Sequence, residues 1–321
     1  MRTVSAASEG AAVTPSGIDV VGDVHGHAGA LDSLLVRLGY QLHEGVWGHP
    51  TRLAVFVGDL IDRGPEQLRT VNIVRRMVEA GAARCLMGNH EYNAVAWLTP
   101  HPHHPDEFLR SHNSRHHHQH KAFLAEVESA PEVHRELVEW FAQLPLWLDL
   151  HGCRVLHACW DELHMDMLAP HVDSEGRLAR SVLEHSMLKG SHEHQAIEVL
   201  LKGPEATLPP GVHFHDKDGH LRREVRLAWW DTEATTFRDA ALPMKGLDLA
   251  AIPNEPLPAS ALPVISRGGP VFFGHYWRTG TPHPQTSNIA CVDYSAGRGE
   301  PLVAYRWDGE AELLPEKFVA S

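Results

Sequence analysis

The segment from Gly58 to Pro65 places two carboxylates and one guanidinium within a few residues, on Asp59, Asp62 and Arg63. It follows the apolar run from Leu53 to Val57. A run of about five β-prone residues that stops at a Gly-Asp pair predicts a buried parallel strand, whose carboxyl end is where open α/β sheets place their ligands. Acidic side chains and an arginine at that point indicate a site for a metal ion and a phosphate group.

Four further places combine metal-ligand side chains with the end of a predicted strand. They are Asp23 with His25, Asn89 with His90, His157, and His275 after Gly274. Carboxylate, imidazole and amide donors together suit Mn²⁺, Fe or Zn²⁺ better than the all-oxygen sites of Mg²⁺ or Ca²⁺. Two metal ions about 3.5–4 Å apart need a shared carboxylate. Asp59 is the expected bridge.

Alternating strands and helices are predicted to position these groups. The expected strands are 18–21, 53–57 and 84–87, and the helices that follow them are 30–38, 66–80 and one beginning after Glu91. Each strand ends in polar residues before its helix. This order is typical of an α/β fold in which the polar ends gather at one edge of the sheet.

The rest of the chain is predicted to add a helical insertion and a second sheet. Residues 92–144 are read as the insertion, with a Pro- and His-rich stretch followed by helices near 120–129 and 131–143. A hairpin is expected at 147–150 and 153–157, and a largely helical part at 161–203. Later strands are predicted at 212–214, 270–274, 288–294, 302–307 and 312–318, with a turn at 216–219 and an irregular surface loop at 242–263.

Composition limits the class of protein. The 321 residues are 43% hydrophobic and 21% charged, which suits one domain over 18–321 after a disordered leader at 1–17. A net charge of −13 argues against non-specific nucleic acid binding. The four cysteines have no CxxC spacing, and no apolar run approaches the ~20 residues of a membrane helix. A cytoplasmic protein without a membrane partner is expected.

The motifs GDVHG, GDLIDRG and GNHE, followed by a later His and a Gly-His pair, resemble those of the calcineurin-like metallophosphoesterases of the phosphoprotein-phosphatase type. The resemblance extends from Asp23 to His275. It implies a four-layer α/β/β/α sandwich of two mixed β-sheets, with the metal ions at one edge.

The resemblance also implies a role for each site residue. Asp23 and His25 would bind one metal ion, Asp59 would bridge both, and Asn89, His157 and His275 would bind the other. His90 would act as the general acid, Asp62 would orient it, and Arg63 would hold the phosphate. The cofactor is expected to be two divalent ions, Mn²⁺ first, with Fe or Zn²⁺ as alternatives.

The expected reaction is phosphoester hydrolysis by a metal-bridging hydroxide, with His90 protonating the leaving oxygen. The first choice of substrate is a phosphoprotein or a small phosphomonoester. The alternative is a dinucleoside polyphosphate or another nucleotide, because the segments 273–277 and 291–307 resemble diadenosine tetraphosphatases, although those enzymes often lack an acid where this chain has Asp62. A non-catalytic binding scaffold is the third hypothesis, and it conflicts with a complete set of expected ligands.

Several assignments remain open at this level. A second phosphate-binding arginine could be Arg278 or Arg238. His116 and His120 have the i, i+4 spacing of a helical metal site, but a solvated, mobile His-rich loop is preferred. Asp62 and Arg63 could form only an ion pair. The aromatic residues Trp229, Trp230, Tyr276 and Trp277 could contact substrate, although core packing is the preferred interpretation.

Overall fold

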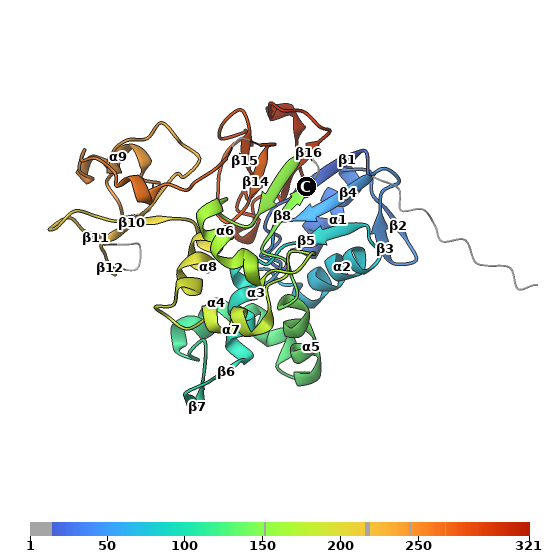
Figure 1. The fold of residues 1–321 in the computed structure, drawn as a ribbon. Coiled ribbons are helices and arrows are strands. Elements are labelled where there is room, and N and C mark those ends of the chain that lie inside the picture. Colours follow the sequence, from blue (N-terminus) through green and yellow to red (C-terminus); the bar gives the residue numbers. More distant parts are fainter. Residues whose placement is uncertain (1–14, 151, 216–218, 244–245, 267) are drawn as a thin grey trace, which may run out of the picture.

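Two mixed β-sheets form the centre of the computed structural model, which describes residues 15–321 apart from 151, 216–218, 244–245 and 267 (Figure 1). The first sheet has the order β17-β16-β1-β4-β5. Its strands are β1 (Gly17–Val21), β4 (Arg52–Phe56), β5 (Ala83–Cys85), β16 (Val303–Trp307) and β17 (Phe318–Ala320). Strands β1, β4 and β5 are parallel to one another, while β16 runs antiparallel to both β1 and β17.

The second sheet has the order β15-β14-β9-β8. Its strands are β8 (Trp147–Leu150), β9 (Cys153–Leu156), β14 (Val271–Phe273) and β15 (Ile289–Cys291). Strands β9, β14 and β15 are parallel, and β8 pairs with β9 as the predicted hairpin. The expected α/β fold of two mixed sheets is confirmed.

The main hydrophobic core fills the space between the sheets and under the helices. Val20 and Val55 of the first sheet share one buried cluster with Val155 and Phe272 of the second. The alternating neighbours on each strand, such as Phe56, belong to the cluster beneath the helices. Both faces of the parallel strands are therefore buried, which explains their unbroken apolar sequences.

Nine α-helices lie among the described residues. They are α1 (Ala28–Arg37), α2 (Gln67–Glu79), α3 (Asn89–Leu98), α4 (Ser114–Val127), α5 (Pro131–Phe141), α6 (Glu162–Leu168), α7 (Arg180–Ser186), α8 (His192–Lys202) and α9 (Phe237–Ala240). The predicted helices after the first three strands are all present. Helices α3, α4 and α5 form the predicted insertion and lie at the bottom of Figure 1.

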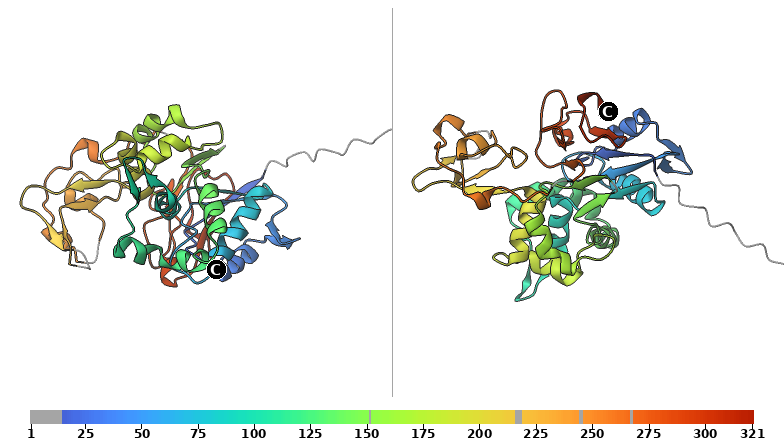
Figure 2. Two further views of the ribbon diagram at one scale, coloured as in Figure 1. Left: turned by 90° about the horizontal axis from the view of Figure 1, so that it is seen from below. Right: turned by 45° about the horizontal axis from the view of Figure 1, so that its top comes forward.

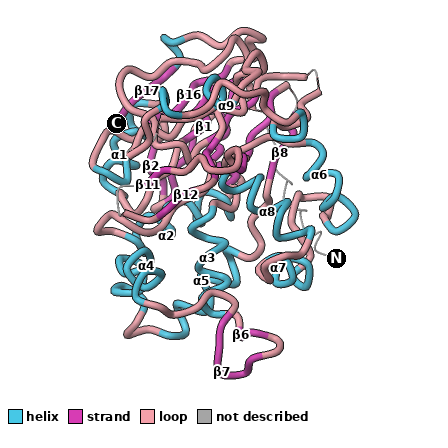
Figure 3. Tube along the Cα trace, turned by 90° about the vertical axis from the view of Figure 1, so that its left-hand side faces the viewer, coloured by secondary structure: helices cyan, strands magenta, loops and turns pink. Residues whose placement is uncertain are grey.

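The His-rich stretch is more ordered than a solvated loop, and that prediction was wrong. Strands β6 (Pro100–His101) and β7 (His104–Phe108) form a hairpin, which projects at the bottom of Figure 3. Helix α4 begins six residues earlier than predicted. Asn113 caps its start, because the Asn113 side chain accepts a hydrogen bond of 2.9 Å from the backbone N–H of His116.

The described residues between 205 and 262 form a lobe beside the two sheets, yellow to orange in Figures 1 and 2. It has its own hydrophobic cluster, which includes Val225, Leu227 and Phe237. The lobe contains α9 and the short strands β10 (Glu205–Thr207), β11 (Phe214–His215), β12 (Leu221–Arg222) and β13 (Glu224–Arg226). It interrupts the chain between β9 and β14, which are neighbours in the second sheet.

Some predicted boundaries differ from the structure. The strand predicted at 312–318 is instead a 3₁₀ turn at Pro315–Lys317 followed by β17, because Pro315 has no N–H for a strand ladder and begins the turn. The leader predicted at 1–17 overlaps β1 at Gly17, and residues 1–14 lie outside the described part. Most of the turn predicted at 216–219 also lies outside it.

The remaining strands are a hairpin of β2 (Gln41–His43) and β3 (Val46–Gly48). Among the described residues, no helix combines the length and apolar character needed to cross a bilayer.

Candidate active site

The polar ends of the parallel strands in both sheets meet at one place. Asp23, Asp59 and Asn89 follow β1, β4 and β5 of the first sheet, while His157 and His275 follow β9 and β14 of the second. All five are buried. The structure therefore brings the predicted ligand residues of the three motifs together with the two later histidines.

Asp59 is the centre of this cluster. One carboxylate oxygen lies 3.7 Å from Nε2 of His25, and the other lies 3.5 Å from Nε2 of His157. Nε2 of His157 is also 3.3 Å from Oδ1 of Asn89. The two oxygens of Asp59 thus face two different sets of donors, as a bridging carboxylate requires.

The backbone at the cluster adopts conformations that side chains rarely take. Non-glycine residues have positive φ at His25 (49°), Asp59 (51°), Asp62 (68°) and His275 (70°). Such strain of about 1–3 kcal/mol per residue persists where the surrounding structure holds it, most often at functional sites. The short turns after the strands therefore aim these side chains into one cluster at some cost in stability.

The imidazoles of His25 and His157 are oriented by backbone carbonyls. Nδ1 of His25 donates to the carbonyl of Ile61, and Nδ1 of His157 donates to that of Val57, both at 2.8 Å. A carbonyl only accepts, so the proton is on Nδ1 and Nε2 keeps a free lone pair facing Asp59. Burial lowers the pKa of His25 to about 4 and also lowers that of His157, so both rings are neutral, as metal ligands must be.

Asp23 and His275 approach each other closely. The Asp23 carboxylate accepts a hydrogen bond of 3.0 Å from the backbone N–H of His275. A Cβ atom at Gly274 would lie 2.1 Å from Oδ1 of Asp23, so only glycine fits there. Burial, together with the carboxylates of Asp293 and Asp59, raises the pKa of Asp23 well above its usual value. A cation among these oxygens would relieve that repulsion.

The donor set fits two divalent ions. His25, Asp59 and His90 form one group, and Asp59, His157 and His275 form a second, each with ligand atoms within 4.8 Å of one another. Nε2 of His25 and both ring nitrogens of His275 are buried without a hydrogen-bond partner. Buried polar atoms without partners are costly, and coordination to a metal ion would satisfy them. Imidazole, carboxylate and amide donors suit Mn²⁺, Fe or Zn²⁺.

His90 and Asp62 form a buried pair beside the cluster. Nδ1 of His90 donates to Asp62 at 2.6 Å, while its Nε2 faces Asp59 at 3.9 Å. Burial acts to lower the pKa of His90, but the carboxylates of Asp59 and Asp62 outweigh it, and the net shift is upward. The hydrogen bond to Asp62 and the upward shift of the pKa both favour the protonated imidazole, the form in which a histidine can donate a proton.

His120 is a site residue that the sequence analysis did not place. Its Nδ1 donates to both oxygens of Asp62, at 3.0 and 3.2 Å, and the residue is buried. Burial acts to raise the pKa of Asp62, but the hydrogen bonds from His120 and His90 lower it. The i, i+4 spacing of His116 and His120 is equally that of a helical metal site. The spacing therefore does not predict the contact between His120 and Asp62. His116 instead interacts with the Ser111 carbonyl near the surface.

The candidate arginines lie in different environments. Arg63 is exposed and, within the described part of the chain, makes no ion pair with Asp62 or any other residue. Arg278 lies near the site with its Nε buried and unpartnered. Arg238 is not brought to the cluster, because it donates to the carbonyls of Ile252 and Ala250 in the lobe. Burial lowers the pKa of the His275 imidazole well below its usual value. Arg226, an arginine that was not predicted, lies close enough to lower this pKa further.

The tryptophans of the 229–230 pair are core residues. Trp229 and Trp230 are buried and pack against Phe273, and Nε1 of Trp229 donates to the Ala158 carbonyl at 2.9 Å. The preference for core packing is thus met at these two positions. Trp277, in contrast, is partly exposed beside His25.

Glu91 is a second buried residue that the sequence analysis overlooked. Its carboxylate accepts backbone hydrogen bonds from Asp59 at 2.8 Å, Leu60 at 2.8 Å and Gly88 at 3.0 Å. These bonds join the turns after β4 and β5. The residue therefore holds the backbone that carries the central aspartate.

Glu91→Ala is expected to lower the free energy of unfolding by roughly 2–5 kcal/mol, because three buried N–H groups lose their acceptor. Thermal and urea unfolding of the purified protein measure this. Glu91→Gln should lose less, since one acceptor oxygen remains. The matched control is Glu107→Ala, at an exposed position of β7. Equal stability of the Glu91 and Glu107 variants would contradict the role of Glu91.

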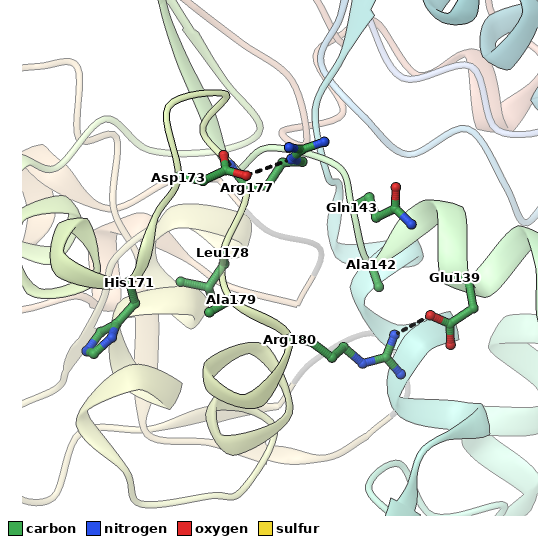
Figure 4. A pocket seen from close by; sticks show the side chains of 9 residues that line it. All are labelled: Glu139, Ala142, Gln143, His171, Asp173, Arg177, Leu178, Ala179 and Arg180. Atoms are coloured by element: carbon green, nitrogen blue, oxygen red, sulfur yellow. Dashed lines mark hydrogen bonds and ion pairs between the residues drawn. The ribbon is translucent and has the colours of Figure 1, made fainter.

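A hollow of about 310 Å³ lies apart from the cluster, between α5 and the segment before α7 (Figure 4). Its arginines already have partners: Arg177 donates to Asp173 at 2.8 Å, and Arg180 pairs with Glu139 at 3.1 Å. None of the predicted ligand residues lines it. The hollow therefore offers no free charge for a phosphorylated ligand.

The family profile described as calcineurin-like phosphoesterase matches residues 17–206, which is more than half of the chain. This chain is a calcineurin-like phosphoesterase. The match includes four of the five strand ends that form the cluster, and His275 lies beyond it. The phosphoesterase is therefore a hydrolase with an α/β fold, and the family resemblance seen in its motifs is confirmed.

Curated relatives of this phosphoesterase match over short segments. It is 43% identical over 74 residues to the bis(5'-nucleosyl)-tetraphosphatase PrpE [asymmetrical] of Oceanobacillus iheyensis, covering 23% of this chain and 30% of the relative. It is 31% identical over 137 residues to the protein of the same name from Bacillus velezensis, covering 42% and 52%. The chain thus spans only about a third to half of these relatives.

Solved structures support the fold over nearly the whole phosphoesterase. A cold-active protein-tyrosine phosphatase from a Shewanella species aligns with a TM-score of 0.53 at 16% identity, covering 94% of this chain and 80% of that one. A protein serine/threonine phosphatase from Saccharomyces cerevisiae aligns with a TM-score of 0.51 at 14% identity, covering 96% and 83%. At these identities the likeness concerns the fold alone.

Proposed function

We propose that this phosphoesterase hydrolyses dinucleoside polyphosphates, using two divalent ions held around Asp59. Hydrolysis is supported by the position of Asp59, whose two carboxylate oxygens face His25 and His157 respectively. The names of the curated relatives support the choice of substrate. The expectation from the sequence was the reverse, with phosphomonoesters as the first choice of substrate and dinucleoside polyphosphates as the alternative.

In this proposal the chain holds the metal ions with Asp23, His25, Asp59, Asn89, His157 and His275. When bound, the ions supply Lewis acidity and activate the attacking water. Arg63 binds oxygens of the phosphoryl group with its bidentate fork and stabilises the charge that develops during transfer. His90 donates a proton to the leaving oxygen, and Asp62 orients the imidazole through Nδ1.

A phosphomonoester, including a phosphoprotein, is the second candidate substrate. The buried pair of His90 and Asp62 favours it, because an alkyl leaving oxygen is basic and needs a proton. A nucleotide leaving group departs as an anion and needs the acid less. The pair therefore favours a phosphomonoester, whereas the names of the relatives favour a dinucleoside polyphosphate.

The experiment is a comparison of substrates with Mn²⁺ supplied in fixed excess. Diadenosine tetraphosphate, a phosphoserine peptide, p-nitrophenyl phosphate and its bis ester are hydrolysed in parallel, and kcat/KM is compared. The proposal expects the highest kcat/KM for diadenosine tetraphosphate. A higher value for the phosphoserine peptide would favour the second candidate, and no hydrolysis of any of them would contradict both.

Arg63→Ala is expected to raise KM and to weaken inhibition by inorganic phosphate by about ten- to a hundred-fold, because a charge-assisted contact is lost. Metal content should stay unchanged, since Arg63 is not among the proposed ligands. Initial rates with and without phosphate, together with metal analysis, measure both effects. If phosphate inhibits the variant as strongly as the parent, another arginine holds the phosphoryl group.

Asp62→Asn is expected to move the alkaline limb of the rate profile to lower pH. His90 donates a proton only while it is protonated, so turnover falls as pH rises through its pKa. The Asp62 carboxylate is one of the groups that raise this pKa, and its neutralisation therefore lowers it. Rates of parent and variant across the alkaline range, at constant free Mn²⁺, measure the shift. If the alkaline limb does not move, the Asp62 carboxylate does not raise the pKa of the catalytic His90.

A further inference from the structure

Trp277 forms a wall of the candidate site on the side of His25. Its ring centroid lies 5.3 Å from that of the His25 imidazole, and the two planes are tilted by 31°. Two guanidinium groups approach the same indole. The central carbon of Arg63 lies 5.7 Å from the ring centroid, and that of Arg298 lies 4.5 Å from it.

We propose that Arg298 binds a second phosphate group of the substrate, next to the phosphoryl group held by Arg63. The site would then select substrates with adjacent phosphates, such as nucleoside polyphosphates, over substrates with a single phosphate. This inference rests on the proposed function, in that Arg63 is taken to hold the reacting phosphoryl group. Arg298, which lies outside the sequence motifs, would then determine the preference for substrates with adjacent phosphates.

Both arginines are available to an anion. Arg63 and Arg298 are exposed, and in the described part of the chain neither side chain has an ion pair or a hydrogen-bond partner. Arg52, in contrast, is neutralised by Asp19 at 2.9 Å. Two guanidinium groups without an ion pair lie beside one indole, on a chain whose net charge is −13.

The spacing of the two groups suits neighbouring phosphates. Since the distances of 5.7 and 4.5 Å run to the same indole, the two guanidinium carbons lie no more than about 10 Å apart. Each guanidinium reaches a phosphate oxygen at about 2.7–2.9 Å from its nitrogen atoms. Two phosphate groups joined by a bridging oxygen can therefore contact Arg63 and Arg298 together, one guanidinium to each phosphate.

The loop that carries Arg298 packs against the candidate metal site. The Asp293 carboxylate accepts hydrogen bonds from the N–H groups of Trp277 at 2.6 Å and Ser295 at 2.9 Å. A Cβ atom at Gly297 would lie 2.7 Å from Cδ2 of His25, so the loop packs directly on that imidazole. The base of the Arg298 side chain is therefore pre-organised, which lowers the ordering cost of binding.

The other candidate arginines are less suited to this task. Arg278 is only partly exposed and its Nε is buried, so its guanidinium is less open to a ligand than that of Arg298. Arg238 is bound to carbonyl groups of the lobe. Arg298 therefore takes the place of the second phosphate contact that the sequence left open between Arg278 and Arg238.

The first test compares Arg298→Ala with Arg37→Ala, which removes an equally exposed charge from α1. Both variants and the parent hydrolyse diadenosine tetraphosphate and p-nitrophenyl phosphate at fixed free Mn²⁺. Arg298→Ala should lose about ten- to a hundred-fold more kcat/KM on the tetraphosphate than on the monoester, mainly through KM. Arg37→Ala should keep both rates. Equal losses of Arg298→Ala on the two substrates would overturn the proposal.

The second test does not depend on the reaction. Calorimetry measures the Kd of the Mn²⁺-loaded protein for inorganic tripolyphosphate and for orthophosphate. The parent should bind tripolyphosphate more tightly, and Arg298→Ala should weaken that binding about ten- to a hundred-fold while changing the orthophosphate Kd much less. If the parent binds both ligands equally, or if Arg298→Ala and Arg37→Ala bind tripolyphosphate alike, the second phosphate site does not exist. A parent that binds tripolyphosphate as expected but leaves diadenosine tetraphosphate intact would refute the proposed function alone.

Discussion

Asp59→Asn is expected to abolish nearly all turnover while the fold remains intact. Asp59 faces the donors of both proposed metal positions, with oxygens 3.7 Å from His25 and 3.5 Å from His157. Loss of even an outer partner of a metal ligand typically costs 10–100-fold in affinity or activity. Removing the bridging charge should therefore weaken binding of both ions by more than about 100-fold.

The substitution should spare the fold because asparagine keeps the most important local contact. Oδ1 of Asp59 accepts a hydrogen bond of 2.9 Å from the His90 backbone N–H, and the Asn side chain can still accept it. Metal analysis, thermal unfolding of the metal-free protein and turnover are measured on the same preparation. Asp106→Asn, at an exposed position of β7, is the matched control. Full activity with two ions bound in Asp59→Asn would refute the bridging role.

His90→Asn is expected to lose far more rate on a phosphoserine peptide than on p-nitrophenyl phosphate. General acid catalysis is commonly worth ~10²–10⁴-fold, and it matters most when the leaving oxygen is basic. The alkoxide of serine needs the proton, whereas p-nitrophenol departs readily as an anion. Because the two rates are compared within one protein, a general loss of active enzyme cancels from their ratio.

Two companion variants define the role of His90. Asp62→Asn should show a milder form of the same bias, because Asp62 acts through the imidazole, by a contact of 2.6 Å, and the imidazole itself remains. His118→Asn, at an exposed position of α4, should leave the ratio of the two rates unchanged. If His90→Asn loses the same factor on both substrates with its metal content intact, His90 is not the general acid.

The sequence by itself determined the chemical character of this protein and the plan of its first sheet. Three motifs each follow a short apolar strand, and parallel strands must place their carboxyl ends at one edge of a sheet. The proximity of Asp23, Asp59 and Asn89 therefore follows from local patterns alone. The family and the fold of two mixed sheets were implied by the resemblance of these motifs to those of a known family, and motif order is readable from the sequence because it is a local feature of the chain.

Only the tertiary structure decided which distant residues complete the site. His120 lies 58 positions from Asp62 and reaches it because the insertion folds α4 against α2. Arg298 and Arg63 both lie near the indole of Trp277, while Arg238, equally plausible in the sequence, is held in the lobe. Periodicity and capping report contacts within a few residues. Packing between separate elements sets the remaining distances, and in a chain with 26 histidines and many arginines no local pattern distinguishes the few that reach the site.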